Sequence, residues 1–214
     1  MKNLVIIDYG AGNLLSVHRA LKYLGLEAVI SSDANIISSA SKIILPGVGA
    51  FGNAMNELHE MRLVEPIKLA ASNGIPILGI CLGMQLLLDE SEEFGVSRGM
   101  GLIPGKVLPL SQKKGLAEDV KIPNIGWRRL LEAKNDRFES GDVSCFKGDL
   151  DKYYYFVHSY YAQPKKNEHI LSSSEYGGVL FPAVIGSGKI IGCQFHPEKS
   201  GPNGLNFLRD FCFD

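Results

Sequence analysis

The chain lacks a long apolar run, a basic cluster and a pair of closely spaced cysteines. Its first apolar run, residues 4–7, ends at Asp8 and is too short for a secretion signal or a membrane span. Its 22 Lys and Arg balance 23 Asp and Glu without a run of one sign, which argues against a nucleic-acid-binding surface. The cysteines are far apart, as in proteins of a reducing compartment: Cys81, Cys145, Cys193 and Cys212. We therefore expect a cytoplasmic protein that binds neither membranes nor nucleic acids.

The composition is typical of one compact α/β domain spanning residues 1–214, with 45% apolar and 21% charged residues. Buried parallel strands are predicted at residues 4–7, 42–45 and 75–80, and helices at residues 14–24 and 64–73, before Gly25 and Gly74.

The second half is richer in strands. They are predicted at residues 105–110, 153–160, 170–174, 179–185 and 190–194. Gly186 and Gly188 indicate a hairpin between the last two, and a helix is expected at residues 203–213. Residues 111–150 are polar, interrupted by Gly and Pro, and not assigned. We predict a mixed, mostly parallel sheet flanked by helices.

The sharpest local signal is the sequence G-x-C-x-G around Cys81, between a predicted strand and a helical run. Such a turn imposes a strained backbone on its central residue, and Gly79 and Gly83 let neighbouring segments pass without Cβ clashes. The adjoining helix N-terminus favours a thiolate and can bind an oxyanion. The alternative is a buried structural cysteine, and only a partner base can decide between the two.

A candidate base lies near the end of the chain, in Q-F-H-P-E at residues 194–198. Strand alternation places Gln194, His196 and Glu198 on one side, where the imidazole could take the thiol proton and the carboxylate could orient the ring. The alternatives are a solvated histidine and an exposed glutamate. His158, at the end of a hydrophobic strand, competes for the role of base.

A metal site at Cys193 and His196 is not expected, because residues three apart on a strand point to opposite faces. No metal or cofactor is predicted.

These motifs resemble the class I (triad-type) glutamine amidotransferases, whose signature is a G-x-C-x-G-x-Q elbow followed late in the chain by H-P-E. More narrowly, four segments resemble the glutaminase subunits of imidazole glycerol phosphate synthases: D-Y-G-A-G-N-L-L-S-V from Asp8, P-G-V-G-A-F-G from Pro46, Y-F-V-H-S-Y from Tyr155 and H-P-E-K-S from His196. The resemblance covers almost the whole chain and implies a flavodoxin-like fold.

The resemblance implies that Cys81 attacks the side-chain amide of glutamine, that His196 carries the proton to departing ammonia, and that Glu198 holds the ring. It also implies a glutamine site, including backbone oxyanion donors, made of Gly47, Val48, Gly49, Leu82, Gln85, Glu93, Ser159 and Tyr160. The alternatives are a plain turn at residues 46–52 and a solvated Glu93 in the run D-E-S-E-E.

In such a heterodimer the ammonia passes to a (β/α)8-barrel synthase subunit, which forms imidazole glycerol phosphate and AICAR in histidine biosynthesis. The resemblance also implies that the isolated chain is a poor glutaminase which a liganded partner stimulates. The docking face implied around the tunnel mouth comprises Asn13, Trp127, Tyr155 and Lys199. The alternatives are packing aromatics and a solvated lysine.

The segment before and after Trp127 departs from the family pattern. The family has G-W-N preceded by His and Met, whereas this chain reads P-N-I-G-W-R from Pro123, so that Arg128 replaces the asparagine. A long cation there could change the interface or the gating. The close alternative is a paralogue that supplies ammonia for amidino groups on surface sugars. More distant alternatives are a cysteine peptidase or esterase and a non-enzymatic binding protein.

Overall fold

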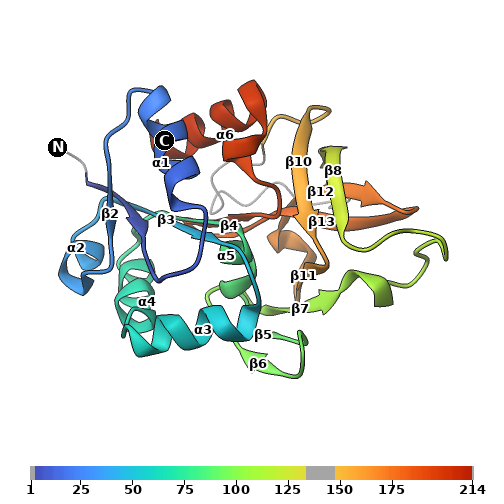
Figure 1. Cartoon of the computed structure of the whole chain (residues 1–214), viewed down its shortest axis with the longest axis horizontal. Coiled ribbons are helices and arrows are strands. Elements are labelled where there is room, and N and C mark those ends of the chain that lie inside the picture. Colours follow the sequence, from blue (N-terminus) through green and yellow to red (C-terminus); the bar gives the residue numbers. More distant parts are fainter. Residues whose placement is uncertain (1–2, 134–147, 214) are drawn as a thin grey trace.

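The computed structural model describes residues 3–133 and 148–213, and its main sheet contains strands from both halves of the chain (Figure 1). The sheet has eight strands in the order β2-β1-β3-β4-β14-β13-β12-β9. Pairing is parallel from β2 to β14 and antiparallel from β14 to β9. The strands are β1 (Leu4–Ile7), β2 (Ala28–Ser31), β3 (Lys42–Gly47), β4 (Ile77–Cys81), β9 (Leu131–Glu132), β12 (Ile170–Tyr176), β13 (Val179–Ser187) and β14 (Ile190–Cys193). The predicted α/β fold with a mixed sheet is confirmed.

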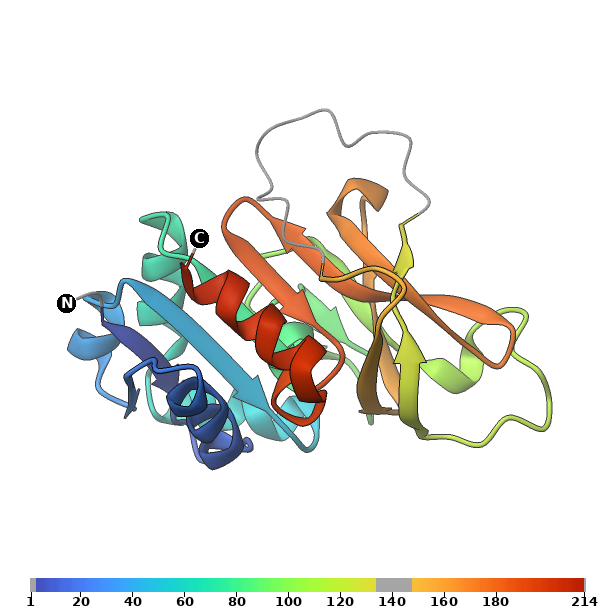
Figure 2. The ribbon, with the colours of Figure 1, turned by 90° about the horizontal axis from the view of Figure 1, so that it is seen from above.

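Helices cover both faces of this sheet. Two of them, α1 (Leu14–Tyr23) and α6 (Gly201–Phe213), lie side by side over one face (Figure 2). The helices on the other side are α2 (Ala34–Ser38), α3 (Phe51–Glu60), α4 (Val64–Ser72) and α5 (Leu82–Leu86). In β1, Val5 and Ile7 pack into the core with α2–α5, whereas Leu4 and Ile6 pack into the core with α1 and α6. Because both faces are covered, these strands are continuous apolar runs.

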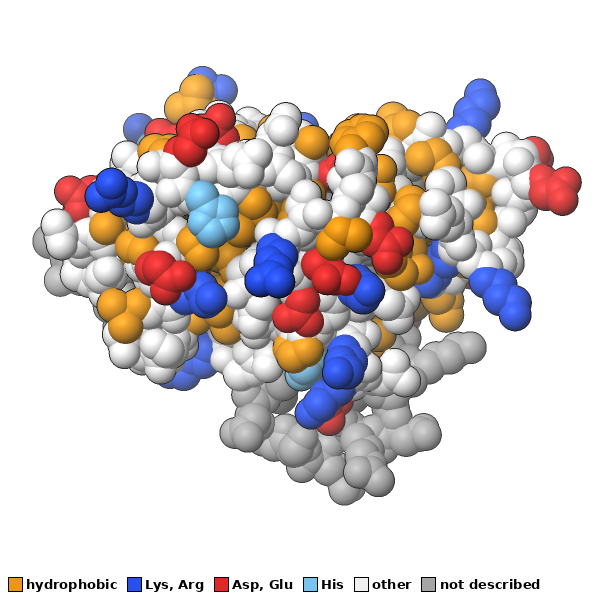
Figure 3. All heavy atoms as spheres, turned by 90° about the horizontal axis from the view of Figure 1, so that it is seen from below, with side chains coloured by type: hydrophobic (Ala, Val, Ile, Leu, Met, Phe, Trp, Pro, Cys, Tyr) orange, Lys and Arg blue, Asp and Glu red, His pale blue; other side chains and the backbone are white. Residues whose placement is uncertain are grey.

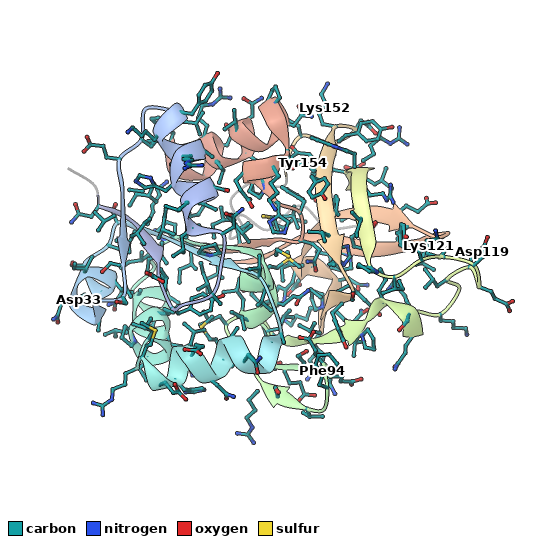
Figure 4. All side chains as sticks on the ribbon, viewed as in Figure 1. Asp33, Phe94, Asp119, Lys121, Lys152 and Tyr154 are labelled. Atoms are coloured by element: carbon teal, nitrogen blue, oxygen red, sulfur yellow. The ribbon has the colours of Figure 1, made fainter. Side chains whose placement is uncertain are left out.

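Two smaller sheets flank the main one. β8 (Asn124–Arg129) pairs antiparallel with β10 (Tyr153–His158). The other sheet has the order β11-β7-β5-β6. Its strands are β11 (Tyr160–Pro164), β7 (Gly105–Pro109), β5 (Glu90–Ser91) and β6 (Ser97–Arg98), and the 3-10 turns of the chain are η1 (Leu110–Gln112), η2 (Asn167–His169) and η3 (Pro197–Lys199). Tyr154 of β10, labelled in Figure 4, packs edge-on against Phe207 of α6 and so joins the smaller sheet to the main core.

The segment at residues 153–160, predicted as one strand, is divided at Ser159. β10 before the break and β11 after it belong to different sheets, and the ring of His158 bonds to the carbonyl of Tyr160 across the break at 2.9 Å. The unassigned stretch 111–150 contains β8 and β9, and its residues 134–147, including Cys145, lie outside the described residues.

Within residues 3–133 and 148–213, no helix has the length and apolar character needed to cross a membrane. On the face shown in Figure 3, positive and negative side chains are interspersed rather than grouped by sign.

Candidate active site

Cys81 occupies a sharp turn between β4 and α5. It ends the strand and caps the helix with φ 55° and ψ −108°, a conformation that residues other than glycine seldom adopt. Such a conformation costs about 1–3 kcal/mol and persists only when the surroundings fix it. A Cβ on Gly79 would lie 2.6 Å from the carbonyl oxygen of Gly83, and one on Gly83 would overlap the carbonyl of Leu45. The strained turn between two close-packed glycines is therefore present as predicted.

His196 reaches the same place from the neighbouring strand. β14 pairs in parallel with β4 and places Cys193 opposite Ile80. The strand alternation that was extended from Gln194 to Glu198 does not hold, because β14 ends at Cys193 and η3 (Pro197–Lys199) turns the chain after His196. This turn folds Glu198 back, and its Oε1 accepts a hydrogen bond from Nδ1 of His196 at 2.9 Å, with 2% and 1% of the two side chains exposed.

The surroundings of His196 favour a protonated ring. Burial alone would lower the pKa of His196, but the sulfur of Cys81 and the carboxylate of Glu198 outweigh it and raise the pKa to about 10. Nε2 is buried and has no hydrogen-bond partner among the described residues. The thiol of Cys81 donates instead to the carbonyl of Val157 at 3.9 Å. Sulfur and ring thus interact electrostatically without completing a well-formed hydrogen bond.

His158, the competing base, already has hydrogen-bond partners on both ring nitrogens. Its Nε2 lies 2.9 Å from Nδ2 of Asn124, and its Nδ1 lies 2.9 Å from the carbonyl oxygen of Tyr160. A carbonyl oxygen can only accept, so Nδ1 carries the proton and Nε2 accepts from the amide of Asn124. Burial lowers the pKa of His158 to about 4, which keeps the ring neutral. Both ring nitrogens are occupied, and His196 is left as the candidate base for Cys81.

A cleft of about 560 Å³ opens over Cys81, at the carboxyl ends of the parallel strands where ligands bind in α/β sheets. The predicted site residues that line it are Val48, Gly49, Cys81, Leu82, Gln85, Glu93, Ser159, Tyr160 and His196. Gly47 does not line the cleft: it pairs with Cys81 in the sheet, and a Cβ there would lie 2.7 Å from the hydroxyl of Tyr9. The lining residues that were not predicted as site residues are Phe94, Pro123, Val157 and His158. Phe94 is 90% exposed at the rim (Figure 4).

Two buried amides connect the cleft to the sulfur. Gln85 donates from Nε2 to the carbonyl of Tyr160 and to Oε1 of Gln194, both at 3.1 Å. Gln194, which is fully buried, donates from its own Nε2 to Sγ of Cys81 at 3.7 Å. Because the amide protons of Gln85 are used inside the protein, its oxygen is the group left for a ligand. Alternation had placed Gln194 beside His196, but no role was predicted for it.

Two further polar groups hold segments at the edge of the cleft. Glu93 accepts from the backbone N–H of Phe51, the first residue of α3, at 2.6 Å, so it is more than a solvated acid. The hydroxyl of Tyr9 donates to the carbonyl of Pro46 at 3.0 Å and anchors the segment that leads to Gly49, whose φ is 105°. Tyr9 lies in the D-Y-G motif and was missed as a site residue.

The predicted docking residues lie around η3. Trp127 of β8 and Tyr155 of β10 are opposite each other in register, with ring centroids 6.0 Å apart, and 49% of Trp127 is exposed. Lys199 is exposed on η3, which contacts both α1 and β10, and Asn13 immediately precedes α1.

The described residues contain no cluster of three or more His, Cys, Asp or Glu side chains that could hold a metal ion. The thiol of Cys193 donates to the carbonyl of Phe195 at 3.5 Å, and His196 is paired with Glu198, so both groups are engaged within the protein.

Comparisons with known proteins agree on one family. The family model described as "Glutamine amidotransferase class-I" matches residues 5–214. The imidazole glycerol phosphate synthase subunit HisH of Geobacillus kaustophilus is 47% identical over 206 residues, which cover 96% of this chain and 94% of that protein. The same-named protein of Lactococcus lactis subsp. lactis is 46% identical over 211 residues, covering 99% and 98%.

Solved structures share the fold. One titled "Structure of PurLQS from Thermotoga maritima" matches with a TM-score of 0.70 and 20% identity over 99% of this chain and 98% of that chain. One titled "Crystal structure of glutamine amidotransferase" matches with a TM-score of 0.69 and 18% identity over 96% and 97%.

Proposed function

Since the chain belongs to the class I glutamine amidotransferases, we propose that it hydrolyses glutamine with a Cys81–His196–Glu198 triad and passes the ammonia to a partner synthase. The observation that carries the proposal is the state of His196. Its Nδ1 is held by Glu198, and its Nε2 has no partner among the described residues although it is buried beside a strained cysteine. Buried polar atoms are normally satisfied, so an exception at this place supports a catalytic role.

The reaction follows from this geometry. The proton shared by Cys81 and His196 rests on Nε2 of the ring, whose pKa is raised, so the sulfur turns from the Val157 carbonyl and attacks the amide carbon of glutamine as a thiolate. A C–S bond forms and the carbonyl electrons move to oxygen, giving a tetrahedral oxyanion. The imidazolium, stabilised by Glu198, then protonates the amide nitrogen, the C–N bond breaks and ammonia leaves. Water, deprotonated by His196, hydrolyses the remaining thioester and releases glutamate.

Backbone N–H groups are proposed to stabilise the oxyanion. Leu82 is the first residue of α5, and its N–H has no acceptor within the helix. Val48 and Gly49 line the cleft on the side of β3, and the positive φ of Gly49 lets a peptide unit turn towards the substrate.

Recognition of glutamine is assigned to the walls of the cleft. The side-chain oxygen of Gln85 can accept a hydrogen bond from the substrate, and Ser159 and Tyr160 line the cleft at the break between β10 and β11. The carboxylate of Glu93 at the edge of the cleft can attract the substrate ammonium.

The partner is proposed to dock on the side of β8 and β10 that carries Trp127 and Tyr155. Val157 follows Tyr155 on the same side of β10 and lines the cleft, and its carbonyl oxygen accepts a hydrogen bond from the thiol of Cys81. Ammonia released at Cys81 can therefore leave past Val157 into a covered interface. The relatives named as subunits of imidazole glycerol phosphate synthase support a (β/α)8-barrel partner that forms imidazole glycerol phosphate and AICAR in histidine biosynthesis.

No observation favours the amidino-sugar paralogue. Its sequence argument was Arg128, and the guanidinium of Arg128 lies 4.9 Å over the ring of Tyr176, on the opposite side of β8 from the side chain of Trp127. A cytoplasmic location also belongs to the proposal, because the thiols of Cys81, Cys193 and Cys212 are free and a nucleophilic thiol needs reducing surroundings.

The test uses the chain alone and in complex with the barrel subunit, and measures glutamate and ammonia release. The isolated chain should be slow, the complex with its liganded partner at least about tenfold faster, which corresponds to a barrier lowered by about 1.4 kcal/mol, and Cys81→Ser inactive in both. Rapid turnover that ignores the partner would contradict the coupling. Full activity of Gln85→Leu would contradict glutamine specificity and favour a general hydrolase. Rescue of a histidine-requiring cell that lacks this subunit tests the acceptor.

A further inference from the structure

Arg128 stands where the similar family has asparagine, and its side chain is half-buried on the inner side of β8. Alternation along β8 puts Asn124, Gly126 and Arg128 on the same inner side. Nη1 of Arg128 donates to the carbonyl of Trp127 at 3.0 Å, and the guanidinium lies over Tyr176. Nε donates to Oδ1 of Asn124 at 3.2 Å.

Only a long side chain can reach Asn124 from position 128. Residues four apart along a strand are separated by about 13 Å, which two short polar side chains cannot span. Gly126 lies between them on the same side, and a Cβ there would lie 3.7 Å from Nη1 of Arg128. The arginine folds back over this glycine. An asparagine at position 128 could not make the contact.

The donors and acceptors of the hydrogen bonds that lead from Arg128 through Asn124 to His158 can be assigned in only one way. Arg128 is always a donor, so Asn124 presents its oxygen to the guanidinium and its NH2 group to Nε2 of His158. His158 then donates from Nδ1 to the carbonyl of Tyr160. Asn124 and His158 are 0% and 6% exposed, so exchange with solvent cannot easily reorient either group. The arginine therefore fixes the orientation of the Asn124 amide from one end of these bonds, and the Tyr160 carbonyl fixes the tautomer of His158 from the other.

The last acceptor in this series of hydrogen bonds, the carbonyl of Tyr160, belongs to the proposed glutamine site. The carbonyl of Tyr160 accepts from Nδ1 of His158 at 2.9 Å and from Nε2 of Gln85 at 3.1 Å. Both Tyr160 and Gln85 line the cleft. Arg128, which departs from the family pattern, is thus connected by four consecutive hydrogen bonds between described residues to the amide that faces the ligand.

We propose that Arg128 is a positioning residue for the glutamine site, which acts through Asn124 and His158 to fix the Tyr160 carbonyl that holds Gln85. The inference rests on the proposed function, in which Gln85 and Tyr160 contact glutamine. Such contacts exist in the ground state and in the transition state alike, so losing their alignment raises KM and leaves kcat nearly unchanged. One hydrogen bond's net contribution corresponds to a rise in KM of about two- to tenfold.

The kinetic test compares Arg128→Asn, Asn124→Leu and the double variant, each in complex with saturating barrel partner. Both single variants should raise the KM for glutamine about two- to tenfold. The double variant should be no worse than Asn124→Leu, because both changes break the same line of bonds. Arg209→Asn is the matched control: it removes the same charge from α6, where the side chain is 51% exposed and 3.5 Å from Asp210, and should keep the wild-type KM.

Nitrogen NMR of the histidine rings gives a readout that needs no catalysis. Wild-type His158 should be neutral with its proton on Nδ1, and Arg128→Asn should shift the signal of its Nε2, because the Asn124 amide that donates to Nε2 is no longer held. Arg128→Lys, which keeps a donor, should restore part of both the spectrum and the KM. Unchanged KM in both single variants, additive losses in the double variant, or a wild-type ring protonated on Nε2 would each overturn the inference. Absence of glutaminase activity in the wild-type complex would instead overturn the proposed function, and the spectrum would still test the line of bonds.

Discussion

Glu198→Gln should lower kcat about tenfold to a hundredfold and leave KM nearly unchanged. The carboxylate lies 2.9 Å from Nδ1 of His196, and both side chains are almost fully buried. A hydrogen bond to a charged group contributes about 1.5–3 kcal/mol, and each 1.4 kcal/mol off the barrier is about a factor of ten in rate. An amide can also turn its NH2 group to Nδ1 and stabilise the wrong tautomer of the ring. Glu198 does not line the cleft, so substrate binding should be spared.

Steady-state glutaminase assays on the partner complex, from pH 6 to pH 10, measure this effect. The variant loses one of the two groups that raise the pKa of His196, so the alkaline limb that reports the protonated ring should move to lower pH. Glu168→Gln is the charge-matched control, because Glu168 forms an exposed ion pair with Lys166 and should behave as wild type. A Glu198→Gln complex with kcat within about twofold of wild type, a difference of about 0.4 kcal/mol, would refute the orienting role of the carboxylate.

Three further substitutions probe the surroundings of the triad. Gln194→Leu removes the amide that bonds to both Cys81 and Gln85, so two buried hydrogen bonds are lost. The variant should be alkylated more slowly at Cys81 by iodoacetamide, and its kcat/KM for glutamine should fall about tenfold or more. Wild-type rates in both assays would contradict a supporting role for Gln194. Gly83→Ala forces a Cβ into a backbone carbonyl and should cost about 1–3 kcal/mol of the free energy of unfolding, seen as a melting temperature several degrees lower; an unchanged melting temperature would show that the elbow can relax. Burial lowers the pKa of His158 to about 4 in the folded protein, against 6.5 for the free side chain. Between these two pH values the unfolded chain therefore binds a proton at His158 that the folded chain does not bind. The contribution of the neutral ring to the free energy of unfolding is complete above pH 6.5, and about 3 kcal/mol of it is lost towards pH 4. Urea unfolding at pH 7 and pH 4.5 should show that His158→Gln loses less free energy of unfolding on acidification than wild type. Equal losses would contradict the burial argument.

The parts of the fold that could be predicted are those where burial acts along a whole segment. β1, β3 and β4 are covered on both faces and therefore read as unbroken apolar runs. β2 was missed because only part of it is buried, and 47% of Val29 is exposed. α3 was missed although its buried residues have helical spacing, a signal that the sequence did contain.

The sequence indicated the residues that are proposed to react, but not the hydrogen bonds that hold them. The G-x-C-x-G spacing reflects a backbone requirement at one turn, which the φ of Cys81 shows directly. The contact from Gln194 to Cys81 joins residues 113 positions apart and depends on which strands are neighbours. The inward turn of Arg128 depends on the empty side of Gly126, which no local pattern indicates.

Covalent labelling with a diazoketone analogue of glutamine, followed by peptide mass spectrometry, tests the central claim most directly. The account predicts one adduct, on Cys81, which excess glutamine suppresses and which His196→Ala slows strongly, while the buried thiol of Cys193 stays unmodified. An adduct on another cysteine, or labelling of Cys81 that neither glutamine nor the loss of His196 affects, would contradict it.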